Sequence, residues 1–378
     1  MLLLEHDAKT LMAARGVPVP DGTWLAEGAE PALPCVLKAQ LPAGGRGKAG
    51  GIRIVRDRAE AKRARREVAA LEIGGHRVAG LRAEALVTGA RELYLGFAID
   101  AARRAVRVMV SPEGGVDVET AGRAAMSVVH ASPEPAALER ACAQAAAGLP
   151  APERAVLASA APVLARCFLD LEAQLLEINP LFAHDDGSWV AGDVRLTCDE
   201  NALPRQPAMA ALIAARPGVY AGACFKMAHG YDFAVIDPDG EIGLVTTGAG
   251  LSMKIIDEMT ARGARPWNFC DIRSGQMRGD PARLVEILRR MAAAPGLRVV
   301  LVNIFAGVTD LDEFAALLLA ARAEVPELTL PMVVRLVGNG QVAAEARLGA
   351  AGLALEPDLD RALALAAQIA RPQAQPHA

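Results

Sequence analysis

The sequence predicts two halves of different fold class: an α+β half over residues 1–205 and a doubly wound α/β half over residues 236–372. In the first half, predicted strands and helices do not alternate, whereas from about residue 242 strand, loop and helix follow one another five times. The stretch 206–235, which contains several prolines and glycines, lies between the halves and is typical of a linker. Residues 373–378 are expected to form a frayed tail.

The composition indicates a folded protein with no general attraction to nucleic acids or anionic membranes. The 378 residues are 52% hydrophobic and 22% charged, with a formal net charge of -4. Residues 1–5 lack the basic region of a signal peptide, and no apolar stretch is long enough to cross a bilayer. The six cysteines are scattered without a Cys-x-x-Cys pair, which favours free thiols in a reducing compartment. We therefore expect a cytoplasmic protein.

The first half begins with a short amphipathic helix at 6–15, which ends at Gly16 and is followed by two prolines. Alternating or wholly apolar runs in this half predict strands at 34–39, 52–55, 84–88, 92–99, 105–110, 174–178 and 188–194. Amphipathic runs predict helices at 58–72, 134–147 and 151–168.

The second half contains five predicted strand–helix units. Their strands are expected at 242–247, 266–270, 298–304, 331–336 and 352–355. Their helices are expected at 251–262, 281–293, 311–323, 341–348 and 358–369. Capping residues agree with these limits, because Asp280 precedes a proline at a helix start and Asp310 stands three residues before Glu313. Five such units predict a parallel sheet with helices on both faces, similar to the flavodoxin fold.

The most specific local pattern is the glycine-rich loop at 43–51, which follows the predicted strand that carries Lys38. Five glycines in nine residues allow backbone N–H groups to approach an anion closely, and Arg46 and Lys48 add positive charge. Only six of the 40 basic residues are lysines, so Lys38 and Lys48 mark positions that favour a compact ammonium group. The loop could bind phosphates, or it could be a flexible basic surface loop without the spacing of a Walker A motif.

A second pattern consists of oxygen-bearing side chains near the end of the first half. Glu177 and Asn179 stand two residues apart on a predicted strand and therefore face the same side. Asp193, on the next strand-like segment, could face them across a hairpin. Carboxylate and amide oxygens suit Mg²⁺ bound together with nucleotide phosphates. The alternative is a polar strand end stopped by Pro180, and Glu92 could equally be a charge on an edge strand.

Three glycine-containing loops follow predicted strands in the second half, at 246–251, 303–309 and 335–340. The carboxyl ends of parallel strands gather at one edge of a sheet, where helix N-termini favour anions. Tight turns between strands and helices need glycine in any case, but three such loops together predict a binding crevice. None of the six histidines has metal-ligand spacing or lies in a glycine-rich loop.

Taken in order, these motifs resemble the β subunits of succinate–CoA ligase and of close relatives such as malate–CoA ligase. The resemblance runs from Glu5 to about residue 370. Besides the loop at 43–51, it rests on the segments 92–96, 113–119, 177–181, 201–203, 248–251, 302–305 and 333–336. It implies an ATP-grasp domain of two sub-domains over 1–205 and a CoA-ligase domain over 236–372.

The resemblance also implies a reaction and a partner. The family uses ATP or GTP, with Mg²⁺, to join a small dicarboxylic acid to CoA through a phosphohistidine on a separate α subunit, in an αβ or α₂β₂ assembly. The residues implied to contact the nucleotide are Lys38, Gly45, Arg46, Gly47 and Glu92. Asn179 and Asp193 would bind Mg²⁺, and Glu177 would face the phosphohistidine. The residues implied to line the acid site are Thr247, Gly307, Val308 and Thr309.

The departures from the family pattern cluster on the acid side. Thr247 replaces the usual Asn, and 306–309 reads Ala-Gly-Val-Thr where Gly-Gly-Ile-Val is usual. On the nucleotide side, Pro42 replaces a His and Thr88 lies in a shortened hinge where Glu is common. These changes leave succinate, malate or another substituted short di-acid as candidate substrates. Two other hypotheses remain: a regulatory paralogue that binds nucleotide or acyl-CoA without turnover, and an ATP-grasp ligase that joins a carboxylate to an amine without CoA.

Overall fold

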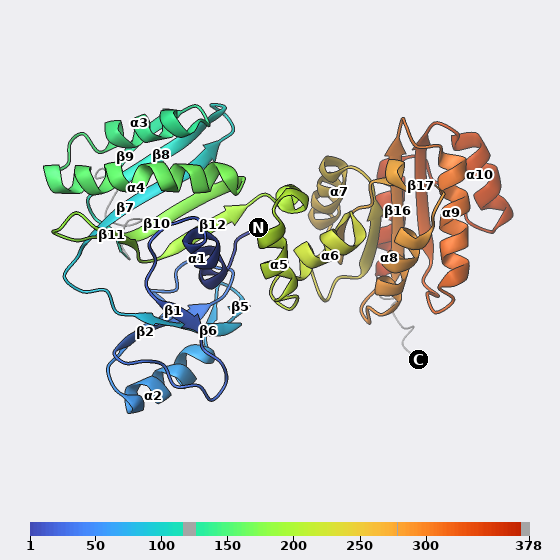
Figure 1. Cartoon of the computed structure of the whole chain (residues 1–378). Helices are drawn as coiled ribbons and strands as arrows, with labels where there is room; N and C mark the ends of the chain where they lie inside the picture. Colours follow the sequence, from blue (N-terminus) through green and yellow to red (C-terminus); the bar gives the residue numbers. More distant parts are fainter. Residues whose placement is uncertain (116–125, 278, 372–378) are drawn as a thin grey trace. The chain divides into compact units, whose positions relative to one another are not determined.

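The computed structural model describes residues 1–115, 126–277 and 279–371, which divide into two compact units with their boundary in the sequence between Tyr220 and Ala221 (Figure 1). Part of the segment 113–119 and the expected tail at 373–378 lie outside the described residues. Within the described part of the chain, no helix is long and apolar enough to cross a membrane.

The first unit contains a small antiparallel sheet covered by one helix. Its strand order is β1–β6–β2–β3, with β1 at Gly22–Trp24, β6 at Gly80–Ala85, β2 at Cys35–Gln40 and β3 at Ile52–Val55. Helix α2 (Arg58–Ala69) packs its buried alanines and Val68 against one face of this sheet (Figure 1). A two-residue pairing of β4 (Glu72–Ile73) with β5 (His76–Arg77) follows α2.

A larger antiparallel sheet completes the first unit. Its order is β11–β10–β7–β8–β9, and β12 also pairs with β10. The strands are β7 (Arg91–Asp100), β8 (Ala105–Ser111), β9 (Ser127–Ala131), β10 (Ala173–Ala183), β11 (Trp189–Ala191) and β12 (Val194–Cys198). Helices α3 (Pro135–Ala145) and α4 (Ala151–Asp170) cover one face. Helix α1 (Glu5–Ala13) packs near β12, and η1 (Glu200–Arg205) leads to α5 (Pro207–Ala214).

Two predictions for the first unit, and one for the segment 206–235 that spans the boundary between the units, differ from the structure. The strand expected at 84–88 is β6, which begins four residues earlier, at Gly80–Ala85, where Leu81, Arg82, Ala83 and Glu84 are all buried. The strand expected at 188–194 is divided into β11 and β12 by a bend at Gly192 and Asp193. The segment 206–235, expected to be a linker, contains α5, α6 (Ala221–His229) and β13 (Asp232–Val235). Its prolines start helices rather than prevent them, since Pro207 is the first residue of α5.

The second unit has a parallel sheet at its centre, in the order β14–β16–β17. These strands are β14 (Ile242–Thr246), β16 (Val299–Ala306) and β17 (Met332–Gly338). Parallel bridges from Ile242 to Pro266 and from Val334 to Leu355 add one segment at each side. The resulting order of segments is that of a flavodoxin-like sheet, 2-1-3-4-5.

The outer two strands of this sheet are shorter than predicted. The segment expected at 352–355 forms a single bridge, and β15 (Asn268–Asp271) pairs antiparallel with β13 instead of extending the sheet. At β15 a side chain takes the place of the ladder, because the amide of Asn268 bonds to the backbone N–H and carbonyl of Leu244 at 2.8 and 2.9 Å.

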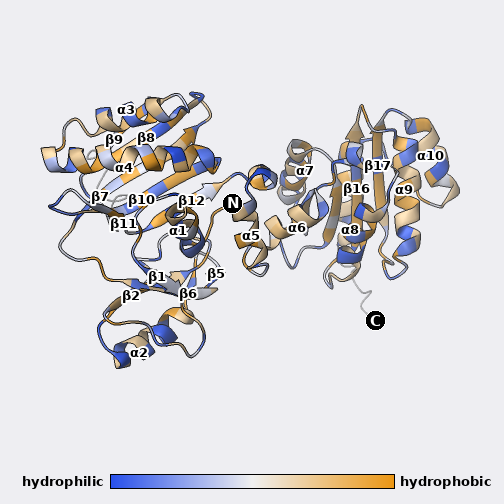
Figure 2. Ribbon diagram, viewed as in Figure 1, coloured by the Kyte–Doolittle hydropathy of each residue, from blue (hydrophilic) through white to orange (hydrophobic). Residues whose placement is uncertain are grey.

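Helices cover both faces of the parallel sheet, as predicted for a doubly wound fold. Alternate residues of β16 face opposite ways: Val299 and Leu301 pack toward α7 (Ala249–Ala261) and α11 (Leu359–Ala370). Val300 and Val302 pack on the side of α8 (Ala282–Ala292), α9 (Leu311–Glu324) and α10 (Gln341–Ala350). A short turn, η2 (Ser274–Gln276), follows β15. Figure 2 shows the central strands of this unit as strongly hydrophobic, and the predicted fold class is confirmed.

Candidate functional site

Strand β2 presents Lys38 on the face of the small sheet that α2 does not cover. Leu37 and Ala39 point toward α2, so the alternation of a strand places Lys38 on the opposite face. Lys38 pairs in register with Arg82 of β6, and Glu84, two residues further along β6, lies on this same face. Two neighbouring strands thus place a row of buried charged side chains on this face of the sheet.

Lys38 is almost completely buried among acceptors. Its Nζ atom lies 2.9 Å from Glu5 Oε1, 2.6 Å from Glu84 Oε1 and 2.7 Å from the carbonyl oxygen of Gly192. Burial alone would lower the pKa of Lys38, but the carboxylates of Glu5, Asp193 and Glu84 outweigh it and raise the pKa above its ordinary value. Lys38 therefore carries its charge at any physiological pH.

The glycine-rich loop brings Arg46 to the same place. Gly45 has a φ of +78°, which an L side chain rarely adopts, and a Cβ at Gly51 would lie only 3.2 Å from that of Ala39. Arg46 Nη1 contacts Glu5 Oε2 at 2.8 Å, and Nη2 contacts both carboxylate oxygens of Asp193 at 2.7 and 2.8 Å. Gly47 accepts a backbone hydrogen bond from Gly50, which closes the loop into a turn.

We define the charged cluster as the side chains that meet around Lys38. It consists of four cations and three carboxylates: Lys9, Lys38, Arg46, Arg82, Glu5, Glu84 and Asp193. The cations hold the pKa of Glu5 well below its usual range even though burial opposes this, whereas burial raises the pKa of Asp193. Such a cluster, with more cations than anions at the end of a glycine-rich loop, suits a polyanionic ligand.

Sequence analysis missed four members of the charged cluster. Glu5 and Lys9 lie on α1, and Arg82 and Glu84 lie on β6. Two signals were present: Lys9 is one of only six lysines, and it stands four residues after Glu5, which is the spacing of a helical ion pair.

Glu177 lies on β10 beside a tyrosine and an arginine. Its Oε1 atom accepts a hydrogen bond from the Tyr94 hydroxyl at 2.7 Å, and its Oε2 atom lies 3.3 Å from Arg195 Nη1. Burial and the neighbouring Glu177 carboxylate together raise the pKa of Tyr94. The carboxyl group of Glu177 is only half-buried, so it is accessible while its direction is fixed by two donors.

Asn179 and Asp193 are neighbours through the backbone, since the N–H of Asn179 donates to the carbonyl of Asp193 at 3.2 Å. Their side chains have different partners. The amide of Asn179 exchanges two hydrogen bonds with the backbone of Gly115, at 2.6 and 3.1 Å, whereas Asp193 holds Arg46. The two side chains supply oxygen donors of the kind that Mg²⁺ prefers. Among the described residues, no group of three His, Cys, Asp or Glu side chains forms a ready metal site.

Glu92 lies close to the same glycines as Asn179. Its carbonyl accepts a hydrogen bond from Gly114, and a Cβ at Gly115 would stand 2.8 Å from its Oε2 atom. The positive φ of Gly115, +95°, and this close approach explain why glycine is needed there. The predicted residues of the first unit therefore form two neighbouring groups: Lys38, Arg46 and Asp193 in one, Glu92 and Asn179 in the other.

In the second unit, three hydroxyl groups from separate loops meet at the carboxyl edge of the parallel sheet. Ser274 Oγ lies 3.3 Å from Thr247 Oγ1 and 3.0 Å from Thr309 Oγ1. Gly307 and Val308 form the exposed tip of the loop before Thr309, and Val308 is 96% exposed. The structure thus brings Thr247 and Thr309 together through Ser274, which sequence analysis did not place in the site.

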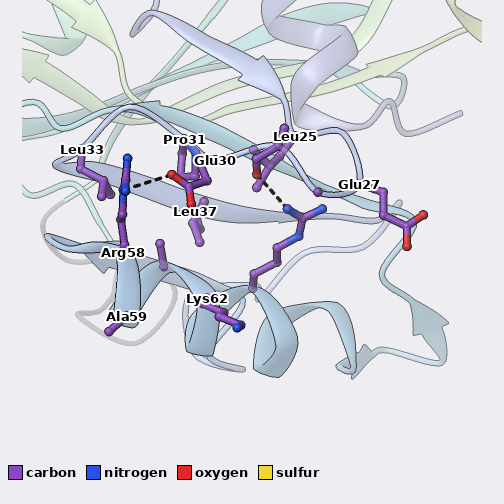
Figure 3. A pocket seen from close by; sticks show the side chains of 13 residues that line it. Leu25, Glu27, Glu30, Pro31, Leu33, Leu37, Arg58, Ala59 and Lys62 are labelled. Atoms are coloured by element: carbon purple, nitrogen blue, oxygen red, sulfur yellow. Dashed lines mark hydrogen bonds and ion pairs between the residues drawn. The ribbon is translucent and has the colours of Figure 1, made fainter.

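A cavity of about 590 Å³ in the first unit lies away from all of these residues (Figure 3). Leu25, Leu33 and Leu37 form part of its wall, and α2 contributes Arg58 and Lys62. Because Leu37 and Lys38 point to opposite faces of β2, the cavity opens on the side of the sheet opposite to the charged cluster. We therefore do not assign it to the candidate site.

Comparison with known protein families matches both units. An ATP-grasp domain matches residues 2–183, and a CoA-ligase domain matches residues 245–369. A solved structure of "ATP citrate lyase from Methanothrix soehngenii in complex with citrate and coenzyme A" is similar to the chain, with a TM-score of 0.75. It covers 97% of this chain and 99% of its own at 18% sequence identity, which shows that the fold is shared.

Closer relatives are β subunits of ADP-forming succinate–CoA ligases. The subunit from Chloroflexus aurantiacus is 35% identical over 92% of this chain and 93% of its own length. The subunit from Ignicoccus hospitalis is 34% identical over 98% of this chain and 100% of its own length. The ATP-grasp and CoA-ligase domains occur here in the order that the sequence motifs predict. The chain therefore belongs to the succinate–CoA ligase β-subunit family, whose members are ligases that join an acid to the thiol of CoA and so form a carbon–sulfur bond.

Proposed function

We propose that this chain is the nucleotide-binding subunit of an acid–CoA ligase that uses ATP, or GTP, to activate a small dicarboxylic acid. The observation that carries the proposal is the meeting of Lys38, Arg46 and Asp193, which come from three segments far apart in the sequence. Family membership and the two matched domains support the same reaction class.

In this proposal the charged cluster is the phosphate site of the ATP-grasp domain. Lys38 and Arg46 neutralise the phosphates, and the loop backbone at Gly45 and Gly47 approaches them closely. Glu92 contacts the nucleotide. In the free chain Glu5 and Glu84 hold Lys38, and Glu5 and Asp193 hold Arg46, so a bound nucleotide must compete with these carboxylates.

Asn179 and Asp193 are the residues that would hold Mg²⁺. Both offer hard oxygen atoms and lie on adjacent backbone segments, which supports the assignment. When bound with the nucleotide, the ion would neutralise charge on the phosphates. Asp193 must exchange its contact with Arg46 for this role, which frees Arg46 for the nucleotide at the same time.

The proposed reaction needs a separate α subunit that supplies a phosphorylated histidine. The phosphoryl group leaves the nucleotide, breaking a P–O bond, and forms a P–N bond with the partner's histidine. It then passes to the carboxylate of the acid, and the CoA thiol displaces phosphate from the acyl phosphate. Glu177, oriented by Tyr94 and Arg195, faces the histidine during the first transfer. The neutral hydroxyls of Thr247, Ser274 and Thr309 line the second site together with Gly307 and Val308.

Succinate is the first candidate acid, and a hydroxylated short di-acid such as malate is the second. The three clustered hydroxyls favour the second candidate, because they can donate to and accept from a substrate hydroxyl group. We also propose a cytoplasmic location, which the six free cysteines support.

The test uses this chain purified together with its α subunit. ADP and GDP formation is followed with succinate, D- and L-malate, glutarate and itaconate, with and without CoA. We expect nucleotide consumption that depends on both CoA and one of the di-acids. A complex that consumes no nucleotide with any short di-acid, or that does so equally well without CoA, would contradict the proposed function.

A further inference from the structure

Two lysines in the charged cluster share the same three partners. Lys38 Nζ contacts Glu5, Glu84 and the carbonyl of Gly192 at 2.6–2.9 Å. Lys9 Nζ contacts the same three groups, at 2.7 Å, 2.7 Å and 2.8 Å. Because an ammonium group has three N–H donors, both lysines are fully satisfied, and each carboxylate has two ammonium partners.

The two lysines differ in their access to a ligand. The side chain of Lys9 is 0% exposed, on α1, whereas Lys38 lies beside Arg46 and the partly exposed Asp193. Lys9 is therefore enclosed and cannot reach a bound nucleotide. A buried cation of this kind is stable only because it compensates buried carboxylates, and here it compensates Glu5 and Glu84.

We propose that Lys9 is a positioning residue of the nucleotide site, which keeps Glu5 and Glu84 compensated while Lys38 and Arg46 bind phosphate. This inference rests on the proposed function. With Lys9 present, the charged cluster holds four cations against three carboxylates, so one positive charge is in excess and is available to an anionic ligand. Without Lys9, three cations face three carboxylates, so Glu5 and Glu84 hold Lys38 more strongly and Glu5 holds Arg46 more strongly.

The first test compares two substitutions on the same helix, both in the full chain. Lys9→Met removes the charge and keeps much of the side-chain volume. Asp7→Asn is the matched control, because Asp7 is also buried on α1 but pairs with Arg216 and Tyr220 outside the charged cluster. The dissociation constant of ATP with Mg²⁺ is measured by calorimetry. We expect about tenfold or greater weakening for Lys9→Met, and less than about twofold for Asp7→Asn, although both lower the melting temperature.

A second test restores the balance of charge. Combining Lys9→Met with Glu84→Gln removes one cation and one carboxylate, and is expected to bring ATP affinity back to within about threefold of the wild type. Glu84→Gln alone leaves four cations against two carboxylates and is expected to bind ATP at least as tightly as the wild type. This single variant tests the same balance if Lys9→Met does not fold.

Three results would overturn the role of Lys9. They are unchanged ATP affinity in Lys9→Met, equal weakening in Asp7→Asn, and weaker binding in Glu84→Gln with no recovery in the double variant. A purely structural role predicts the last pattern, because each substitution would then lower ATP affinity further by destabilising the fold. A wild-type chain that binds no ATP would overturn the proposed function itself, so the two failures are distinguishable.

Discussion

The candidate sites of the two units are built from opposite kinds of contact. In the first unit, Lys38 and Arg46 have carboxylate oxygens within 3 Å and lie almost completely buried. In the second unit, Thr247, Ser274 and Thr309 share neutral hydroxyl contacts at the foot of an exposed loop. Removing one charge from the first site leaves another charge buried without compensation, whereas exchanging a hydroxyl costs far less. The comparison predicts that removing a cation from the charged cluster strongly weakens nucleotide binding, whereas substitutions among the hydroxyls of the second unit change which acid is preferred.

The largest effect is expected from Lys38→Ala. It removes a phosphate-binding charge and leaves Glu5 and Glu84 with one cation fewer, so turnover by the complex should fall by about 100-fold or more. The free energy of unfolding should also fall by about 3 kcal/mol. Nucleotide turnover and urea unfolding measure the two effects. Lys62→Ala, on the exposed side of α2, serves as the control. An equal loss of turnover and stability in Lys62→Ala would show that the effect is not specific to the charged cluster.

A smaller effect is expected from Asp193→Asn. The substitution weakens one proposed Mg²⁺ ligand and also loosens Arg46, so the Mg²⁺ concentration for half-maximal turnover should rise by about 10-fold or more. Titration of Mg²⁺ at saturating ATP measures this change. If turnover falls without any change in the Mg²⁺ requirement, Asp193 only positions Arg46.

On the acid side, Thr247→Asn should redistribute activity rather than abolish it. An amide in place of the hydroxyl changes the donors offered to the acid, and we expect the ratio of kcat/KM for malate and succinate to change by about tenfold. The KM for ATP should stay within about twofold of the wild-type value. A large loss with every acid would show that this site is as constrained as the charged cluster.

The smallest effect concerns His6, at the edge of the charged cluster. Burial and the neighbouring Arg82 guanidinium lower the pKa of His6 to about 4, from an ordinary value of 6.5. Between these values the unfolded chain binds a proton that the folded chain does not, so stability falls as the pH is lowered from about 6.5 toward 4. We expect His6 to contribute about 1 kcal/mol to this fall, because solvent screens a half-buried ring.

Urea unfolding at pH 7.5 and pH 5 measures the contribution of His6. His6→Asn keeps an acceptor for Arg82 but does not titrate, so it should lose less stability over the same interval. An equal loss in the variant would place the pH dependence in other groups of the cluster.

Much of the fold follows from local patterns in the sequence. The loop at 43–51 and the strand with Lys38 were predictable because glycine clustering and the alternation of apolar residues are local signals. The limits of β15 and of the segment near Leu355 were not, because strand pairing depends on contacts between separate segments, such as that of the Asn268 side chain with the backbone of Leu244. Helices within 206–235 were also missed, since prolines mark helix starts as well as loops.

The candidate site was predictable only in part. Lys38, Arg46 and Asp193 were identified through a resemblance, and their meeting depends on a contact between segments 147 residues apart. Glu5 and Lys9 were missed because a charged pair four residues apart usually marks a solvent-exposed helix face. Only the tertiary structure shows that this face packs against the charged row of β2 and β6. Ser274 was not placed in the site for the same reason, because only the tertiary structure shows that its hydroxyl contacts those of Thr247 and Thr309.

The most direct test of the account is calorimetric binding of ATP with Mg²⁺ to the full chain, with Arg46→Ala and Arg58→Ala compared with the wild type. Arg46 belongs to the charged cluster, whereas Arg58 borders the cavity on the other face of β2. The account predicts saturable binding that weakens about tenfold or more in Arg46→Ala and is unchanged in Arg58→Ala. Loss of binding in Arg58→Ala with full binding in Arg46→Ala would contradict it, and would place the nucleotide in the cavity instead.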